Sequence, residues 1–448
     1  MKNIEKADLL ITGCSAVMPD ASVTEDAAIA VKDGKIVYIG RASEPGAKVG
    51  ATETLNARGK LAMPGMYDCH THSVQQLLKG GAVDEPPIVW RRILVPYEAS
   101  AGDEDRYHAA LLYCLQMIRA GVTMFSDAGT VNMEPCVRAV EQTGIQALIT
   151  QPCWDSDLSL PEAVRDKNAG EALRKAERLY KSFDGYAQGR IRVCFSFSSP
   201  DTASPELIRL LGEAAGEYGV RLHTHLCQHI DEVKTCVLKY RMRPAELLES
   251  CGVLNDRLLA AHCIHVTDRD IHMMAERGVN IVHCPSSNLT TQGLPKYPAE
   301  CAAGARVSLG NDGAAVARQD MFYQAQLLKF ITHACFATLV YDTVGLSIKE
   351  AYEMITINGA RALGVRDRLG TLETGKQADI VLVDLRTPAL SPSRNILNTV
   401  IMAGSANDVS DVLIKGKIIL KNREFTGLDE EKILSEGKLR LRKLMEKI

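Results

Sequence analysis

Two histidines one residue apart, His70 and His72, are the first residues in this sequence that could do chemistry together. They follow an apolar run at 59–66 that is typical of a short strand. Side chains at positions i and i+2 of a strand face the same side, so both imidazoles could ligate one cation at about 2.1 Å. Most buried histidines are only hydrogen-bonded core residues, so a metal site needs further ligands elsewhere in the chain.

Later strands could supply these ligands if they belong to one barrel. The strand that ends at His70 is followed by apolar, β-rich segments, and helical patterns such as 205–218 and 269–277 lie between many of them. We expect buried parallel strands at 122–126, 145–149, 193–197, 220–225, 258–262, 279–283 and 305–310. Eight strands with intervening helices predict an α/β fold, a (β/α)8 TIM-like barrel whose chemistry lies at the carboxyl ends of the strands.

The two ends of the chain share a different pattern. Residues 8–62 alternate short β-rich runs with turns, and Asp33-Gly34 between apolar runs is a strong hairpin signal. The same pattern returns at 378–384 and 412–420. We therefore expect a small β-sandwich domain built from both chain ends. The predicted divisions are 1–62 and 369–427 for the sandwich, 63–368 for the barrel, and 428–448 for a charged C-terminal helix that packs on the body or on a second subunit.

In such a barrel the carboxyl ends of four strands carry ionisable side chains. His225 ends the fifth strand, His262 ends the sixth and Asp312 follows the eighth, so they would face the same mouth as His70 and His72. Imidazoles combined with one carboxylate suit one divalent metal, Zn²⁺ rather than Fe²⁺. A metal lowers the pKa of its bound water from about 15.7 to near 7. Asp312 could then act as the base that leaves a hydroxide nucleophile, and His262 could polarise the leaving centre.

Five segments also carry a family resemblance. They read PGMYDCHTH at 64–72, HTHL at 223–226, AAHC at 260–263, VHCPSSN at 282–288 and LGNDG at 309–313. Together they resemble the amidohydrolase superfamily, in the branch of atrazine chlorohydrolase and the methylthioadenosine/S-adenosylhomocysteine deaminases, and the resemblance covers nearly the whole chain. It implies that His70, His72, His225 and Asp312 bind the metal and that His262 lies near the bound water or the substrate.

One position departs from this branch. Its deaminases usually place a glutamate three residues after the fifth-strand histidine, whereas this chain has Gln228. A glutamine can orient a ring but cannot exchange a proton at neutral pH. Three explanations stay open: Asp312 shuttles the proton alone, His229 or Glu232 substitutes, or the leaving group needs little protonation, as chloride would.

The expected function is therefore that of a metal-dependent hydrolase that deaminates a nitrogen heterocycle. Because of Gln228, a dehalogenase or cyclic-amide hydrolase is the alternative within the enzyme class. A catalytically inactive scaffold that binds a heterocycle is the alternative outside it.

Substrate contacts are expected from Trp90, Gln228, His283 and Asn288, with Trp90 stacking on a flat ring. Trp154, in the loop after the third strand, is a weaker candidate for the same task. After Asp312, the run VARQ at 316–319 replaces the small polar run that is usual in the adenosine-type deaminases, which weakens the case for a nucleoside substrate. Arg318 of this run could meet an anionic ligand or remain solvated.

Composition limits the other partners. Lys+Arg 52 against Asp+Glu 55 gives a formal charge of -3, which argues against nucleic acid and membrane surfaces. There is no apolar run of about 18 residues for a membrane span, and residues 1–6 lack a signal-peptide pattern, so we expect a cytoplasmic protein that forms a homodimer.

The 13 cysteines show no paired spacing and are expected to be reduced and mostly buried, including Cys69, Cys227, Cys263 and Cys284 beside the histidines.

Overall fold

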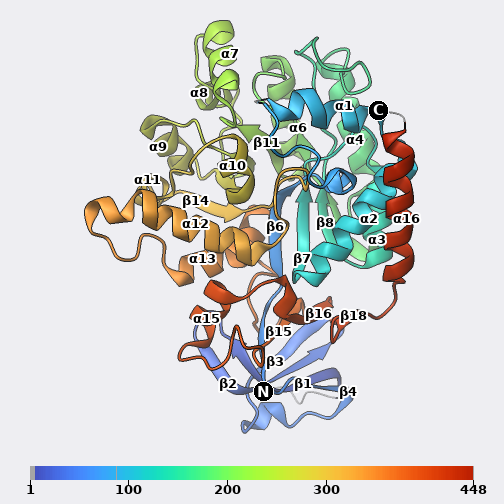
Figure 1. The fold of residues 1–448 in the computed structure, drawn as a ribbon, viewed down its shortest axis with the longest axis vertical. Coiled ribbons are helices and arrows are strands. Elements are labelled where there is room, and N and C mark those ends of the chain that lie inside the picture. The colour runs from blue at the N-terminus through green and yellow to red at the C-terminus, as the bar shows by residue number, and fades with distance from the viewer. Residues whose placement is uncertain (1–5, 87, 447–448) are drawn as a thin grey trace.

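The computed structural model describes residues 6–86 and 88–446 and contains a parallel barrel (Figure 1). Two parallel sheets form its wall, with strand orders β6-β7-β8-β9 and β10-β11-β12-β13-β14. The strands are β6 (Met66–Thr71), β7 (Val122–Asp127), β8 (Gln146–Ile149), β9 (Ile191–Val193), β10 (Phe195–Ser196), β11 (Leu222–Leu226), β12 (Leu258–His262), β13 (Asn280–His283) and β14 (Arg306–Leu309). The α/β class with parallel sheets is confirmed, and every predicted barrel strand is present.

Two connections join these sheets into a closed wall. Only Cys194 separates β9 from β10, and its N–H donates to the Ile149 carbonyl at 2.9 Å, so β9 and β10 act as one strand. On the opposite side, the Asp312 N–H donates to the His70 carbonyl at 2.9 Å, which links the end of β14 to β6. The described strands are therefore consistent with an eight-stranded (β/α)8 barrel.

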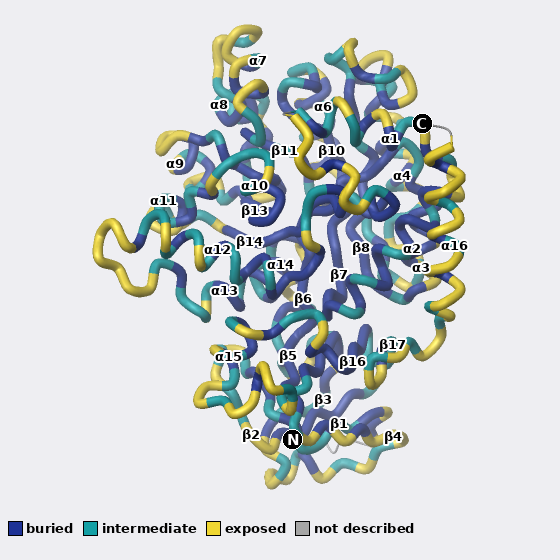
Figure 2. Tube along the Cα trace, viewed as in Figure 1, coloured by how far each residue is buried: buried dark blue, intermediate teal, exposed yellow. Residues whose placement is uncertain are grey.

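Helices cover the barrel because its strands are apolar on both faces. All five residues of β12 are buried, as parallel strands with helices outside require. Strands β7 and β8 are likewise buried along their length (Figure 2). The predicted helices at 205–218 and 269–277 are confirmed as α6 and α9, which begin at the N-caps Ser204 and Thr267.

The helices of the described chain are η1 (Pro45–Ala47), η2 (Ser73–Leu78), η3 (Trp90–Leu94), α1 (Val95–Ser100), α2 (Asp103–Arg119), α3 (Glu134–Thr143), α4 (Ala169–Phe183), α5 (Tyr186–Gly189), α6 (Pro205–Tyr218), α7 (Ile230–Tyr240), α8 (Pro244–Ser250), α9 (Asp268–Glu276), α10 (Pro285–Thr291), α11 (Tyr297–Ala302), α12 (Met321–Cys335), η4 (Ala337–Val340), α13 (Ile348–Ile355), α14 (Ile357–Ala362), α15 (Ile396–Ala403), η5 (Ala406–Asp408) and α16 (Glu430–Met445).

Both chain ends join one nine-stranded sheet beneath the barrel (Figure 1). Its order is β18-β17-β16-β15-β5-β1-β2-β3, and β4 pairs with β1. The strands are β1 (Ala7–Val17), β2 (Val23–Lys32), β3 (Lys35–Arg41), β4 (Ala51–Asn56), β5 (Lys60–Pro64), β15 (Ile380–Asp384), β16 (Val409–Ile414), β17 (Lys417–Lys421) and β18 (Glu424–Phe425). Asp33 and Gly34 form the predicted hairpin turn with φ of 51° and 72°, values that suit a type I′ turn.

The junction between sheet and barrel lies at Gly65. Strand β5 still pairs with β15 at Pro64, two residues beyond the predicted boundary at 62, and β6 starts in the barrel at Met66. A side chain at position 65 would meet the Thr123 hydroxyl at 2.0 Å, so only glycine fits where the chain passes between the two sheets. The division into domains and the sandwich arrangement of the lower sheet stay predictions; residues 1–5 and 447–448 of the outer divisions lie outside the described residues.

The C-terminal helix α16 packs against α2 on the outside of the barrel. Arg119 of α2 donates from Nε to Glu430 at 2.7 Å, and Gly437 faces Leu112 closely enough that a Cβ would lie 2.6 Å from it. Leu439 and Met445 point outward and are exposed.

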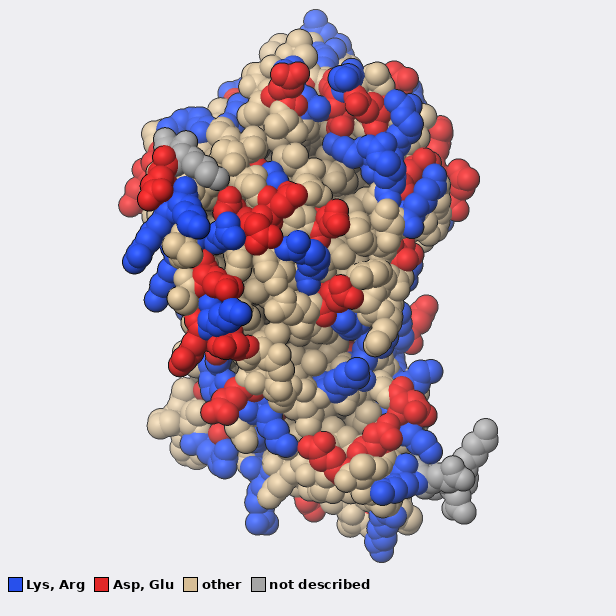
Figure 3. Space-filling view, turned by 90° about the vertical axis from the view of Figure 1, so that its right-hand side faces the viewer, with Lys and Arg blue, Asp and Glu red and all other residues tan. Residues whose placement is uncertain are grey.

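The surface and the cysteines agree with the composition. Acidic and basic side chains are interspersed on the face drawn in Figure 3. No described helix combines the length and the apolar character that a membrane span needs. All 13 cysteines are free and ten of them are buried.

Candidate metal centre

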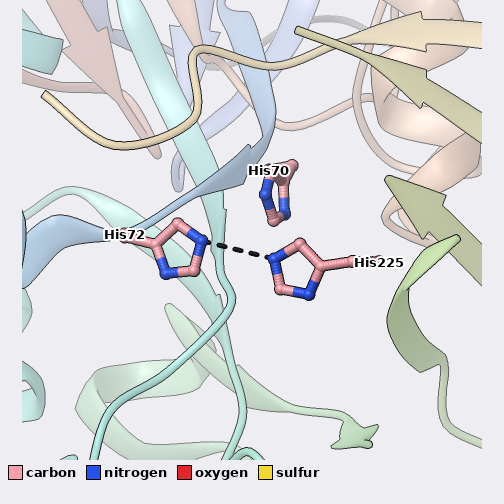
Figure 4. A group of neighbouring side chains, drawn as sticks. All are labelled: His70, His72 and His225. Carbon is pink, nitrogen blue, oxygen red and sulfur yellow. Dashed lines mark hydrogen bonds between the residues drawn. The ribbon is translucent and has the colours of Figure 1, made fainter. Parts of the chain in front are cut away.

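Three histidines and one aspartate converge at the mouth of the barrel, as the sequence predicted. His72 Nε2 lies 3.4 Å from His225 Nε2, with the His70 ring beside both (Figure 4). Asp312 Oδ1 lies 3.6 Å from Nε2 of both His70 and His72. Donor atoms held at about 2.1 Å from one tetrahedral ion are about 3.4 Å apart. These three separations fit ligands of a single divalent ion. The donor atoms of His70, His72 and His225 all lie within 4.8 Å of one another, and so do those of His70, His262 and Asp312, so the two groups meet at His70.

The protonation of the imidazoles also fits a metal. His225 Nδ1 donates to the Ser198 carbonyl at 2.7 Å, which leaves its Nε2 with a free lone pair in the neutral ring. His70 Nε2 is buried and lacks a hydrogen-bond partner among the described residues. Burial lowers the pKa of His70 and His225, and it lowers the pKa of His72 to about 4. The rings are thus neutral near pH 7, the form that binds metals.

His223 supports this geometry, and we did not predict it. It lies on β11 two residues before His225, and its Nε2 is 3.0 Å from His70 Nδ1. If His70 binds through Nε2, its Nδ1–H donates to His223, which fixes the orientation of the ring. The period-2 spacing with His225 was the signal that could have identified it.

Asp312 is the ionised carboxylate of the group. Its Oδ2 accepts from the Ser287 hydroxyl at 2.6 Å and its Oδ1 accepts from the Gly313 N–H at 2.7 Å. Burial raises the pKa of Asp312, but the proximity of His70 and His262 outweighs burial and holds the pKa well below 3.8. Asp312 therefore carries its negative charge at neutral pH and can accept a proton.

His262 plays a different part because Asn288 fixes its tautomer. Asn288 Oδ1 accepts from the Cys284 N–H at 2.9 Å, so the Nδ2 of Asn288 is the atom that faces His262 Nδ1 at 3.0 Å. That amide nitrogen can only donate, so the proton of the neutral His262 ring must be on Nε2. A nitrogen of His262 lies within 4.8 Å of the donor atoms of His70 and Asp312. His262 thus presents an N–H donor to the site rather than a lone pair.

We expect Asn288→Asp to reverse this tautomer and to lower kcat by about 100-fold, the usual cost of losing one preorganised donor. The new carboxylate accepts a hydrogen bond from Nδ1–H of His262. This favours the tautomer in which Nε2 carries a lone pair instead of a proton. Nitrogen NMR of His262 and steady-state kinetics measure the change, with metal content retained. Asn398→Asp, at an exposed position of α15, is the matched control. Full kcat in Asn288→Asp would disprove this role.

His283, Asn288 and Arg318 do not lie on the cavity wall. His283 Nδ1 donates to the His262 carbonyl at 2.8 Å, and its Nε2 is 2.7 Å from Glu300 Oε2. Both ring nitrogens thus bind protein groups, so His283 and Asn288 stand behind His262 instead of facing the ligand space. Arg318 pairs with Asp320 at 2.9 Å and points to solvent, the second of the two outcomes expected from the sequence.

A cavity of about 260 Å³ opens in front of three of the donors, His72, His225 and Asp312. Trp90, Trp154 and Gln228 all line it, as their positions in the sequence suggested. Glu98 of α1 also lines it and was not predicted; its Oε1 accepts from Gln75 at 3.0 Å, and burial raises its pKa to about 7. The volume and the aromatic walls suit one flat heterocycle with small substituents.

One of the three explanations for Gln228 concerns its neighbours, Glu232 and His229. Glu232 lies in the first turn of α7 and lines the cavity, while its carboxylate accepts the backbone N–H groups of Cys227 and Gln228 at 2.7 and 2.8 Å. Burial raises the pKa of Glu232 to about 8. His229 lines the same wall, and burial lowers its pKa to about 4. Glu232 is therefore the neighbour that can carry a proton near neutral pH.

Comparisons with known proteins agree over the whole chain. A model described as the amidohydrolase family matches residues 61–419. A 5-methylthioadenosine/S-adenosylhomocysteine deaminase of Pelotomaculum thermopropionicum is 32% identical, over 98% of this chain and 99% of its own. A 5'-deoxyadenosine deaminase of Methanosarcina mazei is 30% identical over 99% of both.

Solved structures show the same architecture. A zinc-bound adenosine deaminase from Xanthomonas campestris is 29% identical and superimposes with a TM-score of 0.90 over 99% of both chains. Atrazine chlorohydrolase from Arthrobacter aurescens, complexed with zinc, is 21% identical with a TM-score of 0.86, over 97% of this chain and 100% of its own. At that identity the second likeness concerns the fold alone.

Proposed function

The chain belongs to the amidohydrolase family, and from this premise we propose that it hydrolyses the exocyclic amino group of a purine nucleoside or a similar nitrogen heterocycle and releases ammonia. The observation that carries the proposal is the convergence of three unprotonated imidazole nitrogens with an ionised aspartate at one end of an aromatic-walled cavity. Relatives named as adenosine-type deaminases support the substrate class, against the doubt raised by the run at 316–319.

In this proposal His70, His72, His225 and Asp312 would hold one Zn²⁺. When bound, a divalent cation brings the pKa of a coordinated water from about 15.7 to near 7. Asp312 accepts a proton from the attacking water through Oδ1, since its carboxylate is ionised. His262 donates from Nε2–H. This hydrogen bond stabilises the negative charge that develops on an atom bonded to the reacting carbon.

Both protons of the attacking water end on the substrate, one on the ring nitrogen and one on the leaving amine. Gln228 lines the cavity and orients the ring through its amide, but it cannot transfer either proton. We propose that Asp312 returns the proton it has taken, with Glu232 as the second carboxyl able to do so. A dehalogenase or cyclic-amide hydrolase remains the second candidate because Gln228 favours a leaving group that needs no acid.

A substrate panel tests the proposal, with Gln228→Glu as its matched variant. We expect ammonia release from an adenosine-type nucleoside and no chloride release from a chlorotriazine. Gln228→Glu adds an acid at the wall, so we expect at most about a tenfold change in kcat for the natural class of substrate. Chloride release or ring opening without ammonia would refute deamination. Binding of heterocycles with no turnover of any compound would indicate the inactive scaffold.

Three finer points belong to the same proposal. We propose Zn²⁺ rather than Fe²⁺, because the donors are mainly imidazole nitrogens. We also propose a cytoplasmic homodimer, to which the exposed apolar residues Leu439 and Met445 of α16 could contribute. Residues 1–62 and 369–427 would form the sandwich domain beneath the barrel.

A further inference from the structure

The cavity is lined by many acids and by few cations. In addition to Asp312, its wall contains carboxyl groups from four residues, namely Glu98, Asp201, Asp231 and Glu232. Among the described residues, Arg91 is the single lysine or arginine that lines it. Burial raises the pKa of Glu98 to about 7 and that of Glu232 to about 8, so the five carboxyl groups outnumber the charge of Arg91 together with that of a bound divalent ion once the pH exceeds these values.

Arg91 is also held by a loop outside the cavity. Its Nη2 lies 2.6 Å from Asp157 Oδ2, and its Nη1 donates to the Ser159 hydroxyl at 2.8 Å. Ser159 in turn donates from its N–H and its hydroxyl to Asp157 Oδ1, at 2.9 and 2.7 Å. The Asp157 side chain is only 14% exposed, so this pair is less screened by water than most surface ion pairs. The guanidinium is neutralised before any ligand arrives.

We propose that the Arg91–Asp157 pair makes this cavity select heterocycles without an anionic substituent, and that Asp157 is the residue that determines this specificity. The inference takes a heterocycle as the occupant and in that respect rests on the proposed function. A carboxylate on the ligand would lose its water and face the acidic wall without a free cation. An uncharged amide of the same shape would have no such penalty and could bond to Glu98 or Gln228 as donor or acceptor.

A matched pair of ligands tests this specificity in the zinc-loaded enzyme. Purine riboside 5′-carboxylate and purine riboside 5′-carboxamide lack the exocyclic amino group, so neither can release ammonia. They differ in charge and hardly in shape, and calorimetry at pH 8.5 keeps most wall carboxyls ionised. We expect the carboxamide to bind about tenfold more tightly or better. In Asp157→Asn, which frees Arg91, we expect the preference to fall severalfold because the carboxylate gains affinity.

Arg91→Gln provides a second variant, which removes the guanidinium and keeps the Asp157 carboxylate. It leaves Asp157 uncompensated, so we expect the preference for the carboxamide to increase. Glu249→Gln removes the partner of Arg277 on the outside of the barrel and should leave the preference unchanged. Thermal unfolding of each variant checks that it is folded.

Any one of four results would overturn the inference. They are equal binding of the two ligands, tighter binding of the carboxylate, no binding of either ligand, and no effect of Asp157→Asn. Binding is measured without turnover, so the two proposals can fail separately. A retained charge preference without ammonia release would refute only the proposed function. Ammonia release from an adenosine-type nucleoside, together with equal binding of the two ligands, would refute only the specificity.

Discussion

Asp312→Asn is expected to lower kcat by about 1,000-fold or more and to reduce the zinc content of the purified enzyme. Asp312 Oδ1 lies 3.6 Å from Nε2 of both His70 and His72, so the substitution removes the only negative charge among the four donors. It also removes the base, since an amide cannot take a proton from water at neutral pH. General base catalysis alone contributes about 10² to 10⁴ in rate. Ammonia release and elemental analysis measure the two effects.

The fold of this variant should persist. An asparagine can still accept the Gly313 N–H through Oδ1 and can donate through Nδ2 to the Ser287 hydroxyl. Asp268→Asn, an exposed acid in the first turn of α9, is the control and should retain wild-type kcat. Full turnover with stoichiometric metal in Asp312→Asn would show that another residue is the base.

The second large effect concerns stability. Three imidazoles and a carboxylate that converge within a buried site gain free energy from an ion that the unfolded chain does not bind. At a free zinc concentration 1,000 times Kd, such binding stabilises the folded state by about 4 kcal/mol. We therefore expect chelation to lower Tm by several degrees and zinc to restore it.

His225→Ala identifies the site responsible for that shift. It deletes the Nε2 that faces His72 at 3.4 Å, so we expect zinc to have little effect on the Tm of this variant. His272→Ala, at an exposed position on α9, should keep the full shift. An undiminished zinc effect in His225→Ala would mean that the ion binds elsewhere.

The barrel and the four donors could be predicted because local patterns encode them. The strand that ends at His262 is an unbroken apolar run, and the histidines of β6 and β11 stand at strand ends where a barrel gathers its chemistry. The structure brings together all four predicted ligands. Their roles remain predictions until metal is measured.

Other parts of the site depend on contacts that no local pattern encodes. His262 and Asp312 adopt left-handed φ values of 77° and 61°, which non-glycine residues rarely do and which the packing of adjacent strands must impose. Arg91 of η3 meets Asp157 of a loop that lies 66 residues further along the sequence. Asn288 was predicted as a substrate contact. Its Oδ1 accepts from the Cys284 N–H, which directs its Nδ2 toward His262.

Titration of metal-free enzyme with zinc, followed by the rate of ammonia release from an adenosine-type nucleoside, tests the central claim most directly. The account predicts that the rate rises from near zero and reaches its plateau at one zinc per chain, and that Asp312→Asn gives no such rise. Ammonia release that is unchanged in the metal-free enzyme, or zinc-saturated enzyme that releases no ammonia from any heterocycle of the panel, would contradict it.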